Sequence, residues 1–239
     1  MRVPVGRARL LAFSGVFAGL VFAATLVSVY FPATGGYFNL GESMVYTAAI
    51  LGGPLVGAVA GGLGSALADI YLGYAQYAPG TLIIKGAEGF IVGAVYHALR
   101  GMDRERLRRI GLLAGILAGI GLLAAGYYYG VLYGRPVELY LGAGTMIEFS
   151  IPPALWVALS LGVAGVIVYA SQRWEPWMAA AVIAMFAGGA VMVTGYFLYE
   201  AVVLGLGLTA LAEIPINVGQ VLVGAGLAST ILAAVRSAE

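Results

Sequence analysis

A few ionisable and amide side chains interrupt long apolar stretches of this sequence, and their spacing places them on shared helix faces. Lys85 and Glu88 lie three residues apart, so an ammonium and a carboxylate can pair on one helical turn. Glu213, Asn217 and Gln220 follow one another at steps of four and three, which again is a single helix face. Such groups are costly inside a membrane and usually face a cavity or a partner. The pattern therefore indicates an aqueous pocket that binds a small polar ligand.

Structural roles remain open for the same residues. The pair Lys85 and Glu88 is equally compatible with holding two helices in register. Asp69 ends a glycine-rich stretch and is compatible with a capping or pairing role, and the tyrosines that follow it are typical of the aromatic belt at a membrane interface. The group that begins at Glu213 favours a pocket more strongly, because three polar side chains on one face need several partners.

The composition identifies the elements that must position these residues. Of the 239 residues, 62% are hydrophobic and only 10% are charged, and the mean hydropathy is +0.97. These values are typical of a polytopic membrane protein. With 12 basic and 11 acidic residues, the chain has no basic surface for nucleic acid, and we expect no nucleic-acid partner. The lack of cysteine and the single histidine, His97, argue against a metal site, and no cofactor is predicted.

Apolar runs long enough to cross a bilayer recur along the sequence, since a spanning helix needs about 20 mainly apolar residues. They cover residues 10–31, 44–75, 80–99, 110–133, 151–170, 177–199 and 204–235. Glycines interrupt the second run, and we expect it to form two short helices of about 15 residues each with a turn near residues 61–64. In the last run, Pro215 should free the carbonyl of Leu211 from its helical hydrogen bond. The predicted fold class is an all-α membrane bundle of about eight spans.

Arginine sets the expected orientation, because the cytoplasmic loops of membrane proteins carry an excess of basic residues. Three arginines precede the first span, and five lie within residues 100–109. Placing both groups inside requires an even number of crossings between them, which the divided second run supplies. Arg173 and Arg236 then also lie inside and Arg135 lies outside. The sequence thus predicts a multi-pass protein of the cell membrane with both termini cytoplasmic and the polar groups toward the external half.

Small residues recur along the first span. Ala8, Ala12, Gly15, Gly19 and Ala23 follow steps of four, three, four and four, which lays one groove along a single helix face. A groove of this kind accepts a second helix at close range. The spacing alone does not decide whether that helix is internal or belongs to a partner.

Motifs for ATP hydrolysis and for other hydrolytic chemistry do not occur. The sequence has no GxxxxGK[ST] phosphate-binding loop, so we do not expect the chain itself to hydrolyse ATP. It also has no GxSxG or HExxH motif, either of which would indicate a membrane hydrolase. We therefore expect a protein that is not an enzyme and whose energy for any active transport comes from elsewhere.

Two regions of the chain resemble the substrate-binding S components of energy-coupling factor (ECF) transporters. The first consists of GESMVYTAAILGGPLVGAVAGGLGSALAD at residues 41–69 and YAPGTLIIKGAEG at residues 77–89. The second consists of GYFLYE at residues 195–200 and EIPINVGQ at residues 213–220, followed by Gly224. The resemblance implies a six-helix membrane module that captures a vitamin or related micronutrient outside. Such a module docks on a T component driven by two cytoplasmic ATPases and topples in the lipid bilayer to release its cargo.

The resemblance also implies roles for individual residues. In this family an AxxxA pattern on the first helix contacts the T component, and Ala8 with Ala12 matches it, with Gly15 continuing the same face. The family's ligand is held by the loop after the first helix, here about residues 36–42, and by the outer parts of the last three core helices. The implied substrate-binding residues are Asn39, Glu42, Lys85, Glu88, Tyr196, Glu213, Asn217 and Gln220.

The chain departs from the six-helix pattern between residues 110 and 171, where two further spans are inserted. We therefore expect three parts: the first four core helices at residues 1–109, an inserted hairpin at 110–171, and the last two core helices at 172–239. An insertion of two spans preserves the orientation of everything that follows it.

Two other functions remain compatible with these residues. A self-sufficient ion-coupled carrier would use Asp69, Glu88 or Glu213 as a proton or sodium site. A membrane enzyme acting on lipid-borne substrates would use the same carboxylates as acid and base. The identity of the ligand does not follow from the sequence, although a pocket with both ammonium and carboxylate groups suits a zwitterionic or heteroaromatic vitamin.

Overall fold

The structure is a computed structural model that describes residues 7–31, 36–130, 137–141, 145–149 and 152–238. These residues form eight α-helices and two short antiparallel hairpins. The helices are α1 (Arg7–Thr25), α2 (Gly41–Gly52), α3 (Pro54–Leu72), α4 (Ala78–Leu99), α5 (Arg104–Tyr128), α6 (Pro153–Arg173), α7 (Pro176–Leu198) and α8 (Ile214–Ser237). The strands are β1 (Ser28–Phe31), β2 (Gly36–Asn39), β3 (Val137–Leu141) and β4 (Thr145–Phe149). The predicted helical membrane bundle is thereby confirmed.

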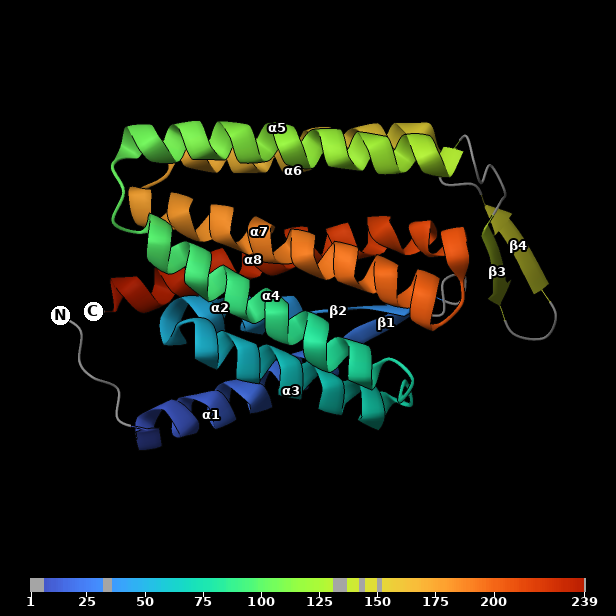
Figure 1. The fold of residues 1–239 in the computed structure, drawn as a ribbon, viewed down its shortest axis with the longest axis horizontal. Coiled ribbons are helices and arrows are strands. Elements are labelled where there is room, and N and C mark those ends of the chain that lie inside the picture. The colour runs from blue at the N-terminus through green and yellow to red at the C-terminus, as the bar shows by residue number, and fades with distance from the viewer. Residues whose placement is uncertain (1–6, 32–35, 131–136, 142–144, 150–151, 239) are drawn as a thin grey trace.

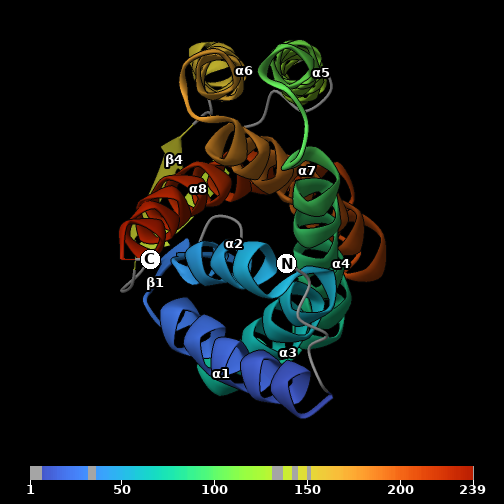
Figure 2. The same ribbon diagram turned by 90° about the vertical axis from the view of Figure 1, so that its left-hand side faces the viewer.

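The helices run roughly along one direction and differ in how they pack (Figure 1). Viewed along that direction, the largely buried α2 lies in the middle, among α1, α3, α4 and α8, and α7 lies beside α4 and α8, whereas α5 and α6 lie side by side on the outside of α7 and α8 (Figure 2). Six segments of the described chain are long and apolar enough to cross a membrane: α3, α4, α5, α6, α7 with the turn after it, and α8 with the turn before it.

The two ends of the bundle differ in composition. The start of α1, the end of α8 and the connection from α4 to α5 lie at one end, and the β3–β4 hairpin lies at the other (Figure 1). The arginines within residues 100–109, together with Arg173 and Arg236, therefore share the first end. Arg2 and Arg135, which also entered the orientation argument, lie outside the described residues.

The second apolar run divides at a different place from the one expected. The turn lies at Gly53, between α2 and α3, and not near residues 61–64, which form the middle of α3. Gly53 has a φ of 87°, a left-handed conformation that glycine adopts without steric cost, and Pro54 then starts α3 with its fixed φ. The two helices also have unequal lengths, 12 and 19 residues. α2 is only about 18 Å long, so the β1–β2 hairpin makes up part of the path between the two ends of the bundle.

The glycines of α3 serve close helix packing, as the composition of this run suggested. A Cβ on Gly61 would lie 2.6 Å from the carbonyl oxygen of Lys85 in α4, and one on Gly64 would lie 2.6 Å from that of Ala18 in α1. One on Gly57 would lie 2.5 Å from the carbonyl oxygen of Gly89. The backbones of α1, α3 and α4 therefore approach to distances that only glycine permits.

The last apolar run is not one kinked α-helix. Residues Gly207–Glu213 form a 3-10 helix, and α8 begins at Ile214. Pro215 thus sits in the first turn of α8, where its missing N–H has no helical partner to lose. The predicted free carbonyl of Leu211 is wrong, because it accepts a hydrogen bond from the backbone N–H of Ile214.

Candidate functional site

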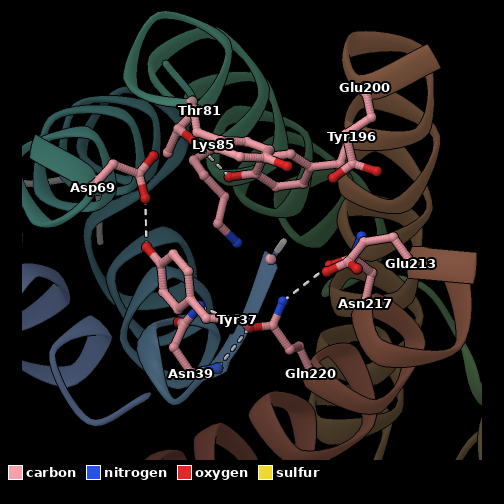
Figure 3. Close-up of a pocket in the computed structure, with 12 residues that line it drawn as sticks. Tyr37, Asn39, Asp69, Thr81, Lys85, Tyr196, Glu200, Glu213, Asn217 and Gln220 are labelled. Atoms are coloured by element: carbon pink, nitrogen blue, oxygen red, sulfur yellow. Dashed lines mark hydrogen bonds between the residues drawn. The ribbon is translucent and has the colours of Figure 1, made fainter. Parts of the chain in front are cut away.

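A polar pocket, drawn in Figure 3, lies at the end of the bundle opposite the described arginines (Figure 1). The cavity itself measures about 40 Å³, so a ligand larger than a few water molecules requires the lining side chains to move apart. Five elements supply its walls: β2, the end of α3, the start of α4, the end of α7 with the π-helical turn Tyr199–Val203, and the junction of the 3-10 helix with α8. The lining residues are Gly36, Tyr37, Asn39, Asp69, Tyr77, Thr81, Lys85, Tyr196, Glu200, Glu213, Asn217 and Gln220.

Hydrogen bonds between amide side chains join β2 to α8 on one side of the pocket. The side-chain oxygen of Gln220 accepts hydrogen bonds from the backbone N–H and from Nδ2 of Asn39, both at 2.7 Å. Nε2 of Gln220 in turn donates to Oδ1 of Asn217 at 3.1 Å, and Oδ1 of Asn39 accepts from the backbone N–H of Gly41 at 2.9 Å. This chain of contacts holds the β1–β2 hairpin against α8 and fixes the start of α2.

The opposite wall combines tyrosines with Asp69 and Thr81. The hydroxyl of Tyr37 donates a hydrogen bond to Oδ1 of Asp69, and the hydroxyls of Thr81 and Tyr196 lie 2.9 Å apart (Figure 3). Burial raises the pKa of the Tyr37 hydroxyl, and the negative charge of Asp69 raises it further. Tyr37 therefore stays protonated and acts as a donor.

Aromatic rings continue from this wall along the edge of the pocket. The rings of Tyr37 and Tyr74 stack with centroids 4.8 Å apart. Tyr74 meets Tyr77 edge-on at 6.5 Å, and Tyr77 lies 6.4 Å from Tyr199. Burial raises the pKa of Tyr77, and the charges of Glu200 and Glu213 add to the increase. The result is a row of aromatic rings beside the polar lining.

Lys85 carries the ammonium group of the pocket and is held from behind by two carboxylates. Its Nζ forms an ion pair with Glu42 at the start of α2 and a second, at 2.9 Å, with Glu88 one turn along α4. The predicted pairing of Lys85 with Glu88 is thus confirmed. Lys85 is 4% exposed and both carboxylates are fully buried. The group couples α2 to α4 directly beneath the ligand space.

The structure brings most of the predicted site residues together. Asn39, Lys85, Tyr196, Glu213, Asn217 and Gln220 line the pocket. Glu42 and Glu88 do not belong to its lining and lie behind it, in contact with Lys85.

Several lining residues were not predicted as ligand contacts. They are Thr81 and Glu200, together with Asp69 and Tyr77, for which the sequence left structural readings open. Tyr37 lies in the loop at residues 36–42 that was expected to hold the ligand, but it was not named individually. A periodicity argument could have found three of them. Thr81 is four residues before Lys85 and Glu200 four residues after Tyr196, so each pair shares a helix face, and Tyr37 shares a strand face with Asn39.

The small residues of the first span do not line the pocket. Ala8, Ala12, Gly15 and Gly19 are exposed along α1, and a Cβ on either glycine would meet no atom within 4 Å. α1 packs on the rest of the chain through another face, which includes the buried residues Ser14 and Val21. No described helix of this chain fills the groove, so the internal-packing alternative does not hold.

Comparison with known proteins places the chain in a transporter family. Residues 7–133, more than half of the chain, match the ECF-type riboflavin transporter, S component. A protein of Pyrococcus woesei, described as "Uncharacterized protein in gap 3'region", is 45% identical to this chain over 109 residues. The matched residues cover 46% of this chain and 70% of that protein. No solved structure matches the chain. Because the family match covers more than half of the chain and the fold is a helical membrane bundle, this protein belongs to the ECF-type riboflavin transporter S components, which are membrane-embedded subunits of vitamin transporters.

Proposed function

We propose that this chain captures riboflavin from outside the cell in the polar pocket and delivers it as the S component of an ECF-type importer. The ligand is inferred from the family description and from the chemistry of the pocket. Riboflavin combines a flat heteroaromatic ring, which carries carbonyl and imide groups, with a chain of hydroxyls. A suitable site therefore needs aromatic surface together with many hydrogen-bond donors and acceptors.

The pocket offers both kinds of surface on separate walls. Tyr37, Tyr77 and Tyr196 present rings for the heteroaromatic part. Asn39, Asn217 and Gln220 present amide groups that can donate to and accept from hydroxyls or imide atoms. Lys85 adds a cationic donor between the two walls. This combination of an aromatic wall and an amide wall is the observation on which the choice of ligand rests.

Release of the ligand to the cytoplasm requires partners, and α1 is the surface we assign to them. Its groove of small residues is exposed and unfilled by the rest of the described chain. Large apolar side chains flank it, with Leu11 72% and Val16 64% exposed. A helix of a T component can approach such a face closely. Two cytoplasmic ATPases attached to that component would supply the energy.

Transport then consists of capture, reorientation and release, with no covalent chemistry on this chain. The protein binds riboflavin with the pocket open to the outside and docks through α1. Its partners favour the orientation in which the pocket opens inward, so that differential docking drives the change. The network that joins β2 to α8 must loosen for the ligand to leave, because it holds the hairpin over the pocket.

Reconstitution tests this proposal directly. The purified chain should bind riboflavin on its own, which quenching of flavin fluorescence measures. Proteoliposomes should take up riboflavin only when the chain is combined with a T component, the two ATPases and ATP. Uptake by the chain alone under a proton or sodium gradient would instead identify an ion-coupled carrier. Turnover of an added lipid without riboflavin binding would identify an enzyme.

A further inference from the structure

A second and larger cavity, here called the apolar chamber, lies between the α5–α6 hairpin and the helices α7 and α8. Its volume is about 470 Å³. It extends along α5 from Ala114 to Ala125 and along α7 from Ile183 to Phe197, and residues of α6 and α8 complete it. Thr194 is the only polar residue among the described residues that line it.

The chamber exists because α5 and α6 pack closely on each other and loosely on α7 and α8. Along their mutual contact, a Cβ on Gly115 of α5 would lie 3.0 Å from the carbonyl oxygen of Ala164 in α6, and one on Gly111 would touch the side chain of Ser171. On the chamber side of α5, a Cβ on Gly121 would meet nothing within 4 Å. Ala190 of α7 also lines the chamber and is exposed. The facing surfaces of α5 and α7 are therefore apart along much of their length.

The position and lining of the chamber limit what can fill it. From Ile183 to Phe197 is about 21 Å along a helix, shorter than the roughly 30 Å of a hydrocarbon core. Both walls are membrane-spanning segments, so the chamber lies at the depth of the lipid tails. Water needs polar partners in a cavity, and the lining offers almost none. An elongated apolar space at this depth matches one or more hydrocarbon chains of the surrounding lipid.

Charge at one end of the chamber indicates which lipid is favoured. Arg104 and Arg108 lie on α5 at the arginine-rich end, before the first chamber residue of that helix. Their neighbours Arg106 and Arg109 form salt bridges with Asp103 and Glu105, each at 3.1 Å. Arg104 and Arg108 instead donate to the main-chain oxygens of Trp174 and Gln172, at 3.1 and 3.4 Å. Nε of Arg108 is buried and has no hydrogen-bond partner among the described residues.

We propose that the apolar chamber is a lipid-binding site, in which a hydrocarbon chain of an anionic phospholipid lies between the hairpin and the core while Arg104 and Arg108 bind its phosphate. Guanidinium groups suit phosphate because they donate several hydrogen bonds in a fixed geometry. Such a lipid would fill the space that the protein leaves open and join the hairpin to α7 and α8. This site is separate from the polar pocket and does not depend on the identity of its ligand.

Native mass spectrometry of the intact detergent-purified chain tests the proposal. The wild-type protein should retain phospholipid as a bound mass after extensive delipidation. Ala118→Trp and Ala190→Trp, which place indole rings inside the chamber, should abolish the retained mass. Leu113→Trp is the matched control, because Leu113 is on α5, 62% exposed and outside the chamber lining, and it should retain lipid as the wild type does. A wild type free of lipid, or equal retention by all three variants, would overturn the proposal.

The headgroup is tested separately. Arg108→Gln should shift the retained lipid from anionic to zwitterionic species, whereas Arg106→Gln, a change at an exposed and paired arginine, should not. A second measurement uses only the wild-type protein and so does not depend on whether the variants fold. Adding anionic phospholipid to the delipidated protein should raise its melting temperature more than adding phosphatidylcholine does. Equal shifts with the two lipids would contradict binding through the arginines.

Discussion

Lys85 shows how one side chain can serve both the stability and the specificity of the site. It lines the polar pocket and is also the only cation in contact with the buried carboxylates of Glu42 and Glu88 among the described residues. A buried charge without a partner is far more costly than a buried pair. Removal of Lys85 therefore affects folding as well as ligand contact, and the two effects must be separated.

We predict that Lys85→Met lowers the free energy of unfolding by about 3–5 kcal/mol, because it leaves two buried carboxylates unpaired. Thermal unfolding in detergent measures the loss. The control is the triple variant Glu42→Gln, Lys85→Met and Glu88→Gln, which removes all three charges and should recover most of the stability. A Lys85→Met protein as stable as the wild type would show that the ion pairs are not coupled to folding.

Gln220 has a simpler role, because its side chain lines the pocket and its hydrogen bonds to Asn39 hold the β1–β2 hairpin against α8. We predict that Gln220→Ala weakens riboflavin binding by about 1–3 kcal/mol, which is roughly fivefold to 150-fold in Kd. The variant leaves Nδ2 of Asn39 without the acceptor it has now. Fluorescence titration of the purified chain measures the change.

Gln172→Ala is the matched control for that measurement. Gln172 lies near the end of α6 at the arginine-rich end, and its contact with Arg108 uses the main-chain oxygen, which the substitution preserves. Its affinity for riboflavin should equal that of the wild type. Similar losses in both variants would mean that the loss at residue 220 is not specific to the pocket.

At the scale of the elements, prolines and glycines decide where the helices start and how closely they approach. α3, α4, α6, α7 and α8 each carry a proline in the first turn, where the missing N–H costs nothing. The glycines of α3 bring α1 and α4 against it. Asp69, Thr81 and Lys85 reach the same pocket because these two short-range effects fix the α3–α4 pair.

We predict that Gly57→Ala destabilises the protein by about 1–3 kcal/mol, because the added methyl group would lie 2.5 Å from the carbonyl oxygen of Gly89. Gly162→Ala in α6 is the control, since a Cβ there meets no atom within 4 Å. It should be neutral or stabilising by up to about 1 kcal/mol, the helix propensity gained over glycine. Melting temperatures of the two variants decide the matter, and an equal decrease in both would contradict close packing of α3 on α4.

On the scale of the whole molecule, the arginines of the described residues and the polar pocket occupy opposite ends of the bundle. This separation is what a protein needs if it faces its ligand on one side of the membrane and its energy source on the other. The orientation itself we infer from the positive-inside rule. The absence of cysteine from the sequence makes this orientation easy to test.

We predict that a single cysteine introduced as Met102→Cys, between α4 and α5, is labelled by a membrane-impermeant maleimide only after the cell membrane is opened. A cysteine introduced as Gln76→Cys, between α3 and α4, should be labelled in intact cells. Gel shift of the labelled protein measures both. The reverse pattern would place the polar pocket on the cytoplasmic side and would exclude capture from outside.

Docking gives a second prediction at this scale. Ala12→Trp should leave riboflavin binding by the isolated chain unchanged and abolish ATP-dependent uptake, because an indole ring would fill the groove that a helix of the T component must enter. Phe13→Trp, at an exposed residue of the same helix that lies away from the row of small residues, is the control and should retain most of the uptake. Loss of binding in the Ala12 variant, or normal uptake, would contradict the assignment of α1 to docking.

Local sequence rules predicted part of the site and missed another part for a physical reason. Helical periodicity correctly paired Lys85 with Glu88, and it grouped Asn217 with Gln220. It could not place Glu42 against Lys85 or Asn39 against Gln220, because residues so far apart in the sequence meet only when helices from different parts of the chain pack together. The turn at Gly53 was missed because several glycines in that run were equally able to form one.

The sequence by itself determined that this chain is a bundle of membrane helices, because its apolar runs have no other stable state in which their backbone groups are satisfied. It also determined the family, through the order of its glycine-rich and polar segments. Only the tertiary structure decided which polar groups share one pocket, which face of α1 stays open, and that the α5–α6 hairpin leaves an apolar chamber beside the core. These features depend on which helix faces pack against each other. Composition cannot specify that packing, because lipid tails and protein interiors are similarly apolar.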